Sequence, residues 1–154
     1  MKLNKIVLSL ALVATAVFGW SQANTPPTVT VSTPTNAVHG KEITVTVKIT
    51  FAEGLHGYQN PPSNPDLIPI KISLDSKDIK IKSIKYPEGK DESVGGDPAK
   101  VRVYEGTINV PVKIMAPKKK GKVKLSFRLD YQQCNSQACY PPDQVSSTAS
   151  LNVK

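Results

Sequence analysis

Cysteine, arginine and aromatic residues are scarce in this chain of 154 residues, which has two cysteines, two arginines (Arg102 and Arg128) and 6% aromatics. Two cysteines are too few for the multiple-disulfide framework that supports the smallest exported domains. Proteins that read nucleic acids usually combine basic clusters with arginine forks or stacking aromatics. The net charge of +8 comes mainly from lysines, and the densest run, Lys118–Lys122, coincides with a turn and has no aromatic nearby. Nucleic-acid binding is therefore not predicted.

Long apolar runs are missing from the chain except near its start. There, two lysines precede an apolar run, and small residues occupy the minus-three and minus-one positions of a possible cut before Asn24: Lys2, Lys5, 6–18, Ser21 and Ala23. This three-part pattern is that of a secretory signal peptide, and the run is too short to span a bilayer comfortably. We predict a signal peptide over residues 1–23 and one exported domain over residues 24–154, with no membrane span in the mature chain.

Residues that bind metals are few as well. Zinc sites need four ligands at suitable spacings, and besides the cysteines the chain offers only His39 and His56 as soft ligands, which nothing in the sequence brings together. Export also places the cysteines in an oxidising compartment, where free thiolates are disfavoured. We expect neither a metal nor another cofactor.

Alternation of apolar and polar residues with period two runs through most of residues 24–154, and no helical stripe of useful length occurs. The alternating segments are 29–31, 43–51, 68–74, 79–86, 101–103, 108–114, 123–131 and 149–153. Within 79–86 the phase slips at Ser83, which indicates a β-bulge. About eight short strands with Pro-, Gly- and Asn-rich turns predict an all-β fold, an immunoglobulin-like antiparallel sandwich. Two long loops, 56–69 and 87–100, are of a length that is often functional.

The two cysteines, Cys134 and Cys139, follow the most regular predicted strand and precede Pro141 and Pro142. Consecutive prolines end strand pairing, so the cysteines are expected on a loop or distorted hairpin at one end of the sandwich. An even pair in an exported domain predicts one internal disulfide. The cysteines are too close in sequence to form the disulfide that joins the two sheets of antibody domains.

The residues alone leave two roles open for this disulfide. A structural cross-link over so short a loop contributes only about 2 kcal/mol on the chain-entropy model, although most even pairs in exported domains are structural. A single exposed disulfide at a turn is, on the other hand, well placed for exchange with other thiols. A thioredoxin-like site is not predicted, because that motif has two intervening residues and a βαβ context.

The segment Tyr131–Cys134, together with Cys139–Pro142, resembles the active-site stretch of the N-terminal periplasmic domain of DsbD, the thiol:disulfide interchange protein. The resemblance extends upstream over most of residues 24–154, through the segments Gly54–Tyr58, Ile68–Leu74, Tyr86–Gly89, Tyr104–Gly106 and Val110–Val112. It implies an immunoglobulin-like domain in the periplasm that takes part in protein-disulfide reduction. Electrons would pass from a thioredoxin-like or membrane donor to disulfide isomerase-type acceptors, all of them separate proteins.

The resemblance also implies roles for individual residues. Cys139 would form the mixed disulfides and Cys134 would resolve them. Residues that line the site or contact a partner would be His56, Tyr58, Tyr131 and Tyr140. The family's cap loop corresponds to the stretch Lys90–Lys100, with Asp91, Glu92 and Val94 as its candidate residues. This cap loop lacks the family's aromatic residue, so the disulfide is expected to be shielded less or differently.

A second hypothesis belongs to another functional class. Immunoglobulin-like sandwiches commonly serve recognition, and fold alone does not determine function. The alternative is therefore a binding or adhesion module in which the disulfide between Cys134 and Cys139 is purely structural. The reduction potential of the disulfide separates the two hypotheses.

Overall fold

The computed structural model describes residues 24–76 and 78–154, and the predicted signal peptide lies outside this part of the chain. The described residues form eleven strands and no helix, so nothing helical in these ranges has the length and hydropathy of a membrane span. In chain order the strands are β1 (Thr28–Ser32), β2 (Glu42–Thr50), β3 (His56–Tyr58), β4 (Lys71–Leu74), β5 (Ile81–Ile84), β6 (Lys90–Ser93), β7 (Lys100–Glu105), β8 (Thr107–Met115), β9 (Gly121–Tyr131), β10 (Gln133–Cys134) and β11 (Asp143–Val153).

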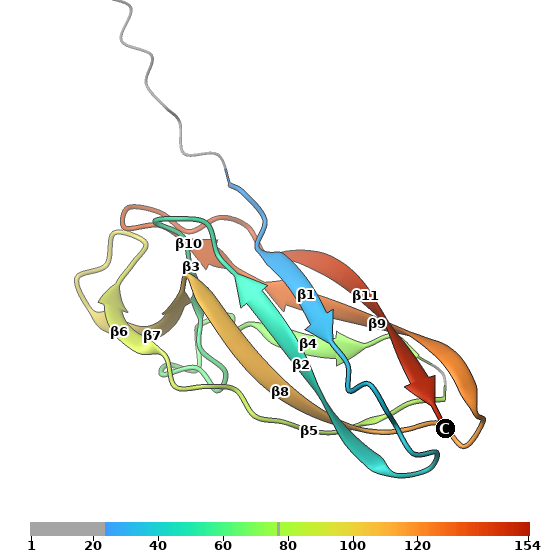
Figure 1. Ribbon diagram of the computed structural model, residues 1–154. Helices are drawn as coiled ribbons and strands as arrows, with labels where there is room; N and C mark the ends of the chain where they lie inside the picture. The colour runs from blue at the N-terminus through green and yellow to red at the C-terminus, as the bar shows by residue number, and fades with distance from the viewer. Residues whose placement is uncertain (1–23, 77) are drawn as a thin grey trace, which may run out of the picture.

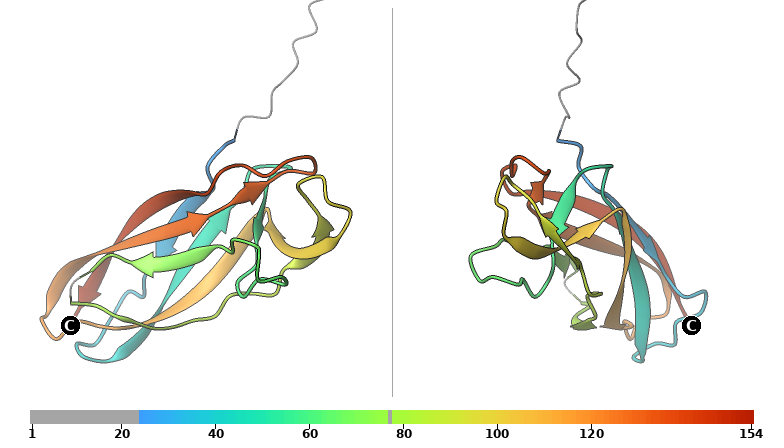
Figure 2. Two further views of the ribbon diagram at one scale, coloured as in Figure 1. Left: turned by 180° about the vertical axis from the view of Figure 1, so that it is seen from behind. Right: turned by 90° about the vertical axis from the view of Figure 1, so that its left-hand side faces the viewer.

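These strands pair antiparallel in three sheets. The first has the order β1-β2-β8-β5 and the second β11-β9-β4, and the buried side chains of both contribute to one core. The third sheet, of order β10-β3-β7-β6, lies at the end of the sandwich remote from the C-terminus (Figures 1 and 2). The predicted all-β antiparallel sandwich is confirmed.

Each of the eight predicted segments overlaps a strand, and the predicted bulge is confirmed by a register shift between Ile81 and Ser83 where β5 pairs with β8. The last strand is longer than predicted: β11 begins at Asp143 and pairs with β9 along its whole length. In its first half, Ser147 takes the place of an apolar residue between Val145 and Ala149, so the alternation was too weak to identify. Three further strands, β3, β6 and β10, lie in segments that the sequence indicated as loops.

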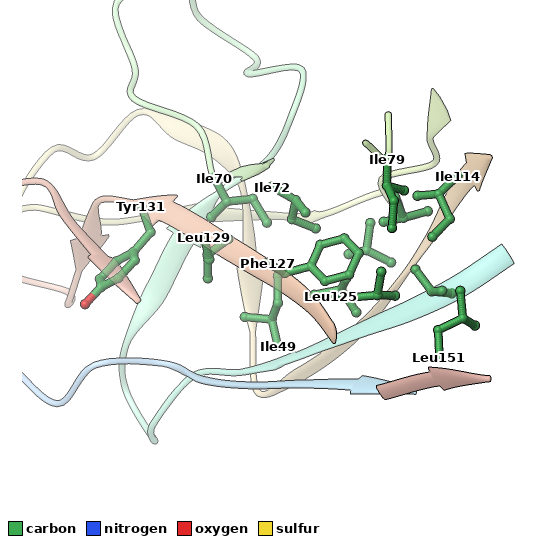
Figure 3. Close-up of a cluster of buried hydrophobic side chains, with 14 of the residues drawn as sticks. Ile49, Ile70, Ile72, Ile79, Ile114, Leu125, Phe127, Leu129, Tyr131 and Leu151 are labelled. Carbon is green, nitrogen blue, oxygen red and sulfur yellow. The ribbon is translucent and has the colours of Figure 1, made fainter. Parts of the chain in front are cut away.

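The core fills the space between the first two sheets (Figure 3). Its large members are 3% exposed or less and come from alternate positions of the strands or from the residues next to them: Ile49, Ile70, Ile72, Ile79, Ile114, Leu125, Phe127, Leu129 and Leu151. Burying such side chains contributes roughly 1.5–3 kcal/mol each. Neither cysteine belongs to this cluster. Cys134 instead packs in a second, smaller cluster with Tyr58, Val94 and Val103, so the main core is assembled without the disulfide.

Candidate functional site

The third sheet carries the cysteine pair at one edge and the cap loop at the other. Cys134 in β10 pairs with His56 in β3, and Tyr58 in β3 pairs with Val103 in β7. Gly57 lies between His56 and Tyr58, and a Cβ there would be 2.6 Å from Cζ of Phe51. Glycine therefore allows β3 to lie directly on the main core. Because side chains alternate along a strand, His56 and Tyr58 both point to the opposite face, where Cys134 lies.

The predicted disulfide between Cys134 and Cys139 is confirmed, with an S–S distance of 2.04 Å. Asn135 organises the loop between them: its backbone N–H donates to the carbonyl of Ala138 at 2.9 Å, and its Oδ1 accepts from the N–H groups of Gln137 and Ala138, each at 2.8 Å. Cys134 is 1% exposed, whereas Cys139 lies among exposed residues and is itself exposed. Of the two cysteines, only Cys139 is an exposed residue.

Tyr58 places its hydroxyl between the two sulfurs, 3.2 Å from Cys134 Sγ and 3.3 Å from Cys139 Sγ. A disulfide sulfur carries no hydrogen, so the phenol is the donor in either contact. Burial raises the pKa of Tyr58, and the negative charge of Asp97 raises it further. The hydroxyl therefore keeps its proton at neutral and mildly alkaline pH, and it remains a donor for charge on either sulfur.

The tip of the cap loop closes over the disulfide with backbone rather than with an aromatic ring. Val94 is 4% exposed and packs in the cluster of Tyr58 and Cys134. The next two residues, Gly95 and Gly96, have φ values of 68° and 81°, and their N–H groups donate to the carbonyls of Asn135 at 2.8 Å and Ser136 at 3.1 Å. A Cβ on Gly95 would lie 2.7 Å from Cys139 Sγ, so only glycine lets the cap approach the sulfur this closely.

His56 lies on the same face as Cys134 and belongs to a short polar chain. Its Nε2 is 3.5 Å from Oε2 of Glu105, and Lys90 donates to the other oxygen of that carboxylate. The hydrogen bond from Lys90 is the main reason that the pKa of Glu105 lies below its ordinary value. A charged carboxylate beside Nε2 favours the tautomer in which Nε2 carries the hydrogen. His56 Nδ1, which is buried and has no partner among the described residues, is then left as an acceptor.

The remaining candidate residues lie in different surroundings. Tyr140 is near the disulfide and its hydroxyl accepts from Asn135 Nδ2 at 3.2 Å. Tyr131 lies in the main core, with its hydroxyl 3.5 Å from Asp143 Oδ2. Asp91 and Glu92 are exposed on β6, and an oxygen of Asp91 lies 3.7 Å from Arg102 Nε. No group of three or more potential metal ligands occurs among the described residues.

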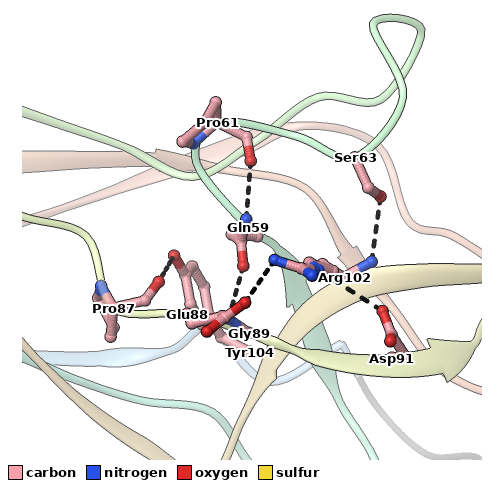
Figure 4. Close-up of polar contacts among 9 residues, drawn as sticks. All are labelled: Gln59, Pro61, Ser63, Pro87, Glu88, Gly89, Asp91, Arg102 and Tyr104. Carbon is pink, nitrogen blue, oxygen red and sulfur yellow. Dashed lines mark hydrogen bonds and ion pairs between the residues drawn. The ribbon is translucent and has the colours of Figure 1, made fainter.

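Two long loops are tied to β7 and so hold the third sheet in place (Figure 4). Gln59 donates to the carbonyl of Pro61 at 3.1 Å and accepts from the N–H of Gly89 at 2.5 Å. Arg102 pairs with Glu88 at 2.6 Å, and Tyr104 donates to the carbonyl of Pro87 at 2.8 Å. These contacts join segments 59–63 and 87–91, which the sequence indicated only as two separate loops.

Sequence reasoning missed Gly95, Asp97, Glu105 and Asn135 as members of the site. Asn135 carried a usable signal, because an asparagine at the start of a tight loop often accepts hydrogen bonds from the backbone that follows. Gly95 and Gly96 lie in the loop 87–100, which the sequence did indicate. Their contact with Cys139 depends on tertiary structure, and so do the positions of Asp97 and Glu105.

A sequence profile described as "Thiol:disulfide interchange protein DsbD, N-terminal" matches residues 25–151. The chain belongs to this family. The DsbD N-terminal domain of Neisseria meningitidis in the reduced form is similar in structure, with a TM-score of 0.51 and 21% identity over 75% of this chain and 82% of that chain. The N-terminal periplasmic domain of ScsB from Proteus mirabilis has a TM-score of 0.58 and 13% identity, over 84% of this chain and 47% of that chain. Among curated proteins, none matches significantly.

Membership in the DsbD N-terminal family confirms the resemblance seen in the sequence, and the structural neighbours support the immunoglobulin-like assignment of the sandwich. The family and the Cys134–Cys139 disulfide together support thiol–disulfide exchange as the chemistry of this site.

Proposed function

We propose that this is an exported protein-disulfide reductase component. It passes electrons through Cys134 and Cys139, from a thioredoxin-like or membrane donor to periplasmic disulfide isomerase-type proteins. The observation that carries this proposal is the asymmetry of the disulfide, in which one sulfur belongs to an exposed residue and the other to a residue that is 1% exposed. A disulfide that only cross-links the fold has no need of one exposed cysteine.

The exchange runs in two halves. A thiolate of the reduced donor attacks Cys139 Sγ, the S–S bond breaks, and Cys134 leaves as a thiolate that takes up a proton. A second donor thiolate then attacks the donor sulfur bound to Cys139, so the donor is oxidised to a disulfide and the domain now holds two thiols. In the second half, the Cys139 thiolate attacks the acceptor's disulfide. Cys134 then attacks Cys139, which releases the reduced acceptor and restores the disulfide.

Tyr58 and the cap loop would assist these steps. The Tyr58 hydroxyl is within hydrogen-bonding distance of both sulfurs, so it would stabilise whichever one carries negative charge. Hydrogen bonds to a charged group are stronger than neutral ones and favour the charged form. The tip of the cap loop lies against Cys139 and would limit access for thiols that are not partners.

Export to the periplasm is part of the same proposal. It is supported by the signal-peptide pattern of residues 1–23 and by the family match over residues 25–151.

The reduction potential of the disulfide tests the proposal directly. An exchanging disulfide is expected to have a potential above about −300 mV, in the range where cellular thiol systems can reduce it. The measurement is equilibration of the purified domain with glutathione or dithiothreitol buffers, followed by counting of free thiols. A potential well below about −300 mV would support the structural disulfide of the alternative, an immunoglobulin-like binding module.

Replacing Tyr58 by phenylalanine is expected to slow exchange at neutral pH. A hydrogen bond to a charged group contributes about 1.5–3 kcal/mol, and 1.36 kcal/mol corresponds to one pH unit. In the reduced Y58F protein, the pH of half-maximal alkylation of the Cys139 thiol should therefore rise by about one to two units. The matched control is Tyr131→Phe, whose hydroxyl faces Asp143 instead of sulfur. An unchanged alkylation profile in Y58F would show that the phenol does not stabilise the thiolate.

A further inference from the structure

Gln133, the residue before Cys134 in the chain, is a fully buried polar side chain at 0% exposure. It is one half of β10 and pairs with Gly57. A buried amide is costly unless its donors and acceptors have partners. The partners of Gln133 therefore bear on how firmly the strand of Cys134 is held.

The amide nitrogen of Gln133 binds the first residues of the described chain. Nε2 donates to Oδ1 of Asn24 and to the backbone carbonyl of Thr25, each at 3.0 Å. A backbone carbonyl only accepts, so this contact fixes which end of the amide is nitrogen. The other end, Gln133 Oε1, is buried and has no hydrogen-bond partner among the described residues. The amide that contacts Asn24 through its nitrogen therefore has a buried oxygen with no donor among the described residues.

We infer that Gln133 is the binding site for the amino terminus that signal-peptide cleavage creates. The inference rests on the proposed export. Hydrolysis of the Ala23–Asn24 bond uses one water and leaves a carboxylate on Ala23 and an α-ammonium group on Asn24. The peptide nitrogen had one hydrogen and a fixed direction, whereas the ammonium has three and rotates freely. The Asn24 ammonium donates to Gln133 Oε1, while the Asn24 side chain keeps its contact with Nε2.

The exposure of Asn24 suits a charged amino group. Asn24 is exposed, so the ammonium stays in contact with water while one of its hydrogens reaches the buried oxygen. Two prolines, Pro26 and Pro27, follow after Thr25, and Pro27 is buried. Proline restricts the backbone, so little further freedom is lost when the segment is held. The chain enters β1 from the same end of the molecule that holds β10 (Figure 1).

The consequence is a link between processing and the disulfide. Binding of the amino terminus satisfies the last buried polar atom of Gln133 and fastens β10, which carries Cys134. A precursor that keeps residues N-terminal to Asn24 has a neutral peptide nitrogen at Asn24 instead of an ammonium group. We therefore expect the processed domain to be more stable than any N-terminally extended form.

The test compares three forms of the oxidised domain: one that begins at Asn24, one that keeps Ala23, and one that begins at Asn24 with an acetylated amino group. Both altered forms are expected to unfold about 3 °C lower than the first, the shift that loss of one good interaction causes in a domain of this size. The side-chain amide resonances of Gln133 in ¹⁵N NMR spectra should move in both. Equal midpoints and unmoved Gln133 resonances would overturn the inference.

A double-mutant cycle makes the assignment specific. In a Gln133→Met background, keeping Ala23 should no longer change the unfolding midpoint; a persistent difference would show that the ammonium acts elsewhere. If Q133M does not fold, the acetylated form decides, because it alters no buried side chain. These measurements need no redox partner, so a negative result would contradict the inference about the amino terminus without bearing on the proposed disulfide exchange. Mass spectrometry of the exported protein completes the test, since a cut elsewhere than before Asn24 contradicts the inference alone.

Discussion

Replacing Cys134 by alanine is expected to leave a domain that accumulates mixed disulfides with its partners, whereas replacing Cys139 by alanine is expected to abolish both mixed disulfides and turnover. In C134A the exposed Cys139 still attacks a partner disulfide, but no second thiol is present to resolve the product. In C139A the remaining thiol belongs to a residue that is 1% exposed and packs among Tyr58, Val94 and Val103. A buried thiol meets a partner disulfide poorly, because exchange requires access as well as a thiolate.

The experiment expresses each variant with its own residues 1–23 in the native compartment, then blocks free thiols and separates proteins on non-reducing gels. Mass spectrometry of the trapped species identifies the donor and acceptor. Both variants are expected to fold, since neither sulfur belongs to the main core and a short-loop disulfide contributes only about 2 kcal/mol. Each therefore serves as the stability control for the other. If C139A forms mixed disulfides and C134A does not, the proposed roles of the two cysteines are reversed. If neither variant forms a mixed disulfide, the result favours the binding module.

The sandwich was predictable because its strands follow a simple rule. A strand with one buried face alternates apolar and polar residues, and β2, β8 and β9 show that alternation over nine residues or more. In the sheet that carries the site, only β7 was predicted from such alternation. β3, β6 and β10 have three, four and two residues, too few for a period to appear. They exist because loops from distant parts of the chain meet at one end of the core.

Some candidate residues could likewise be identified from the sequence, whereas the positions of others depend on the tertiary structure. The cysteines were evident from their number and their place after a strand, and Tyr58 came from the family resemblance. In the structure, the Tyr58 hydroxyl lies within hydrogen-bonding distance of both sulfurs. Tyr131 resembled a site residue equally well, but it ends a core strand and its side chain is 2% exposed. Whether an aromatic side chain next to a site faces the core or the sulfur depends on sheet register, which local sequence does not contain.

The second large effect is expected from Gly95→Ala at the tip of the cap loop. The new Cβ would lie 2.7 Å from Cys139 Sγ, closer than such atoms approach, so the cap must move away from the sulfur. Movement breaks the hydrogen bonds of Gly95 and Gly96 to the cysteine loop, each contributing about 1 kcal/mol net. The open form of the loop then gains roughly 10- to 30-fold in population. Reduction of the disulfide by a small dithiol should accelerate by a similar factor, measured by stopped-flow or quenched thiol counting.

Gly40 provides a matched control, because its φ of 66° is almost that of Gly95 at 68°, while a Cβ at Gly40 would meet nothing within 4 Å. Both alanines carry the cost of a left-handed backbone, about 1–2 kcal/mol, but only the one at position 95 contacts sulfur. G40A should lose stability and keep the reduction rate of the unmodified domain. If G95A also keeps that rate, the cap loop does not limit access to Cys139. If G40A accelerates reduction as much, the effect comes from general destabilisation, and shielding by the cap is excluded as its cause.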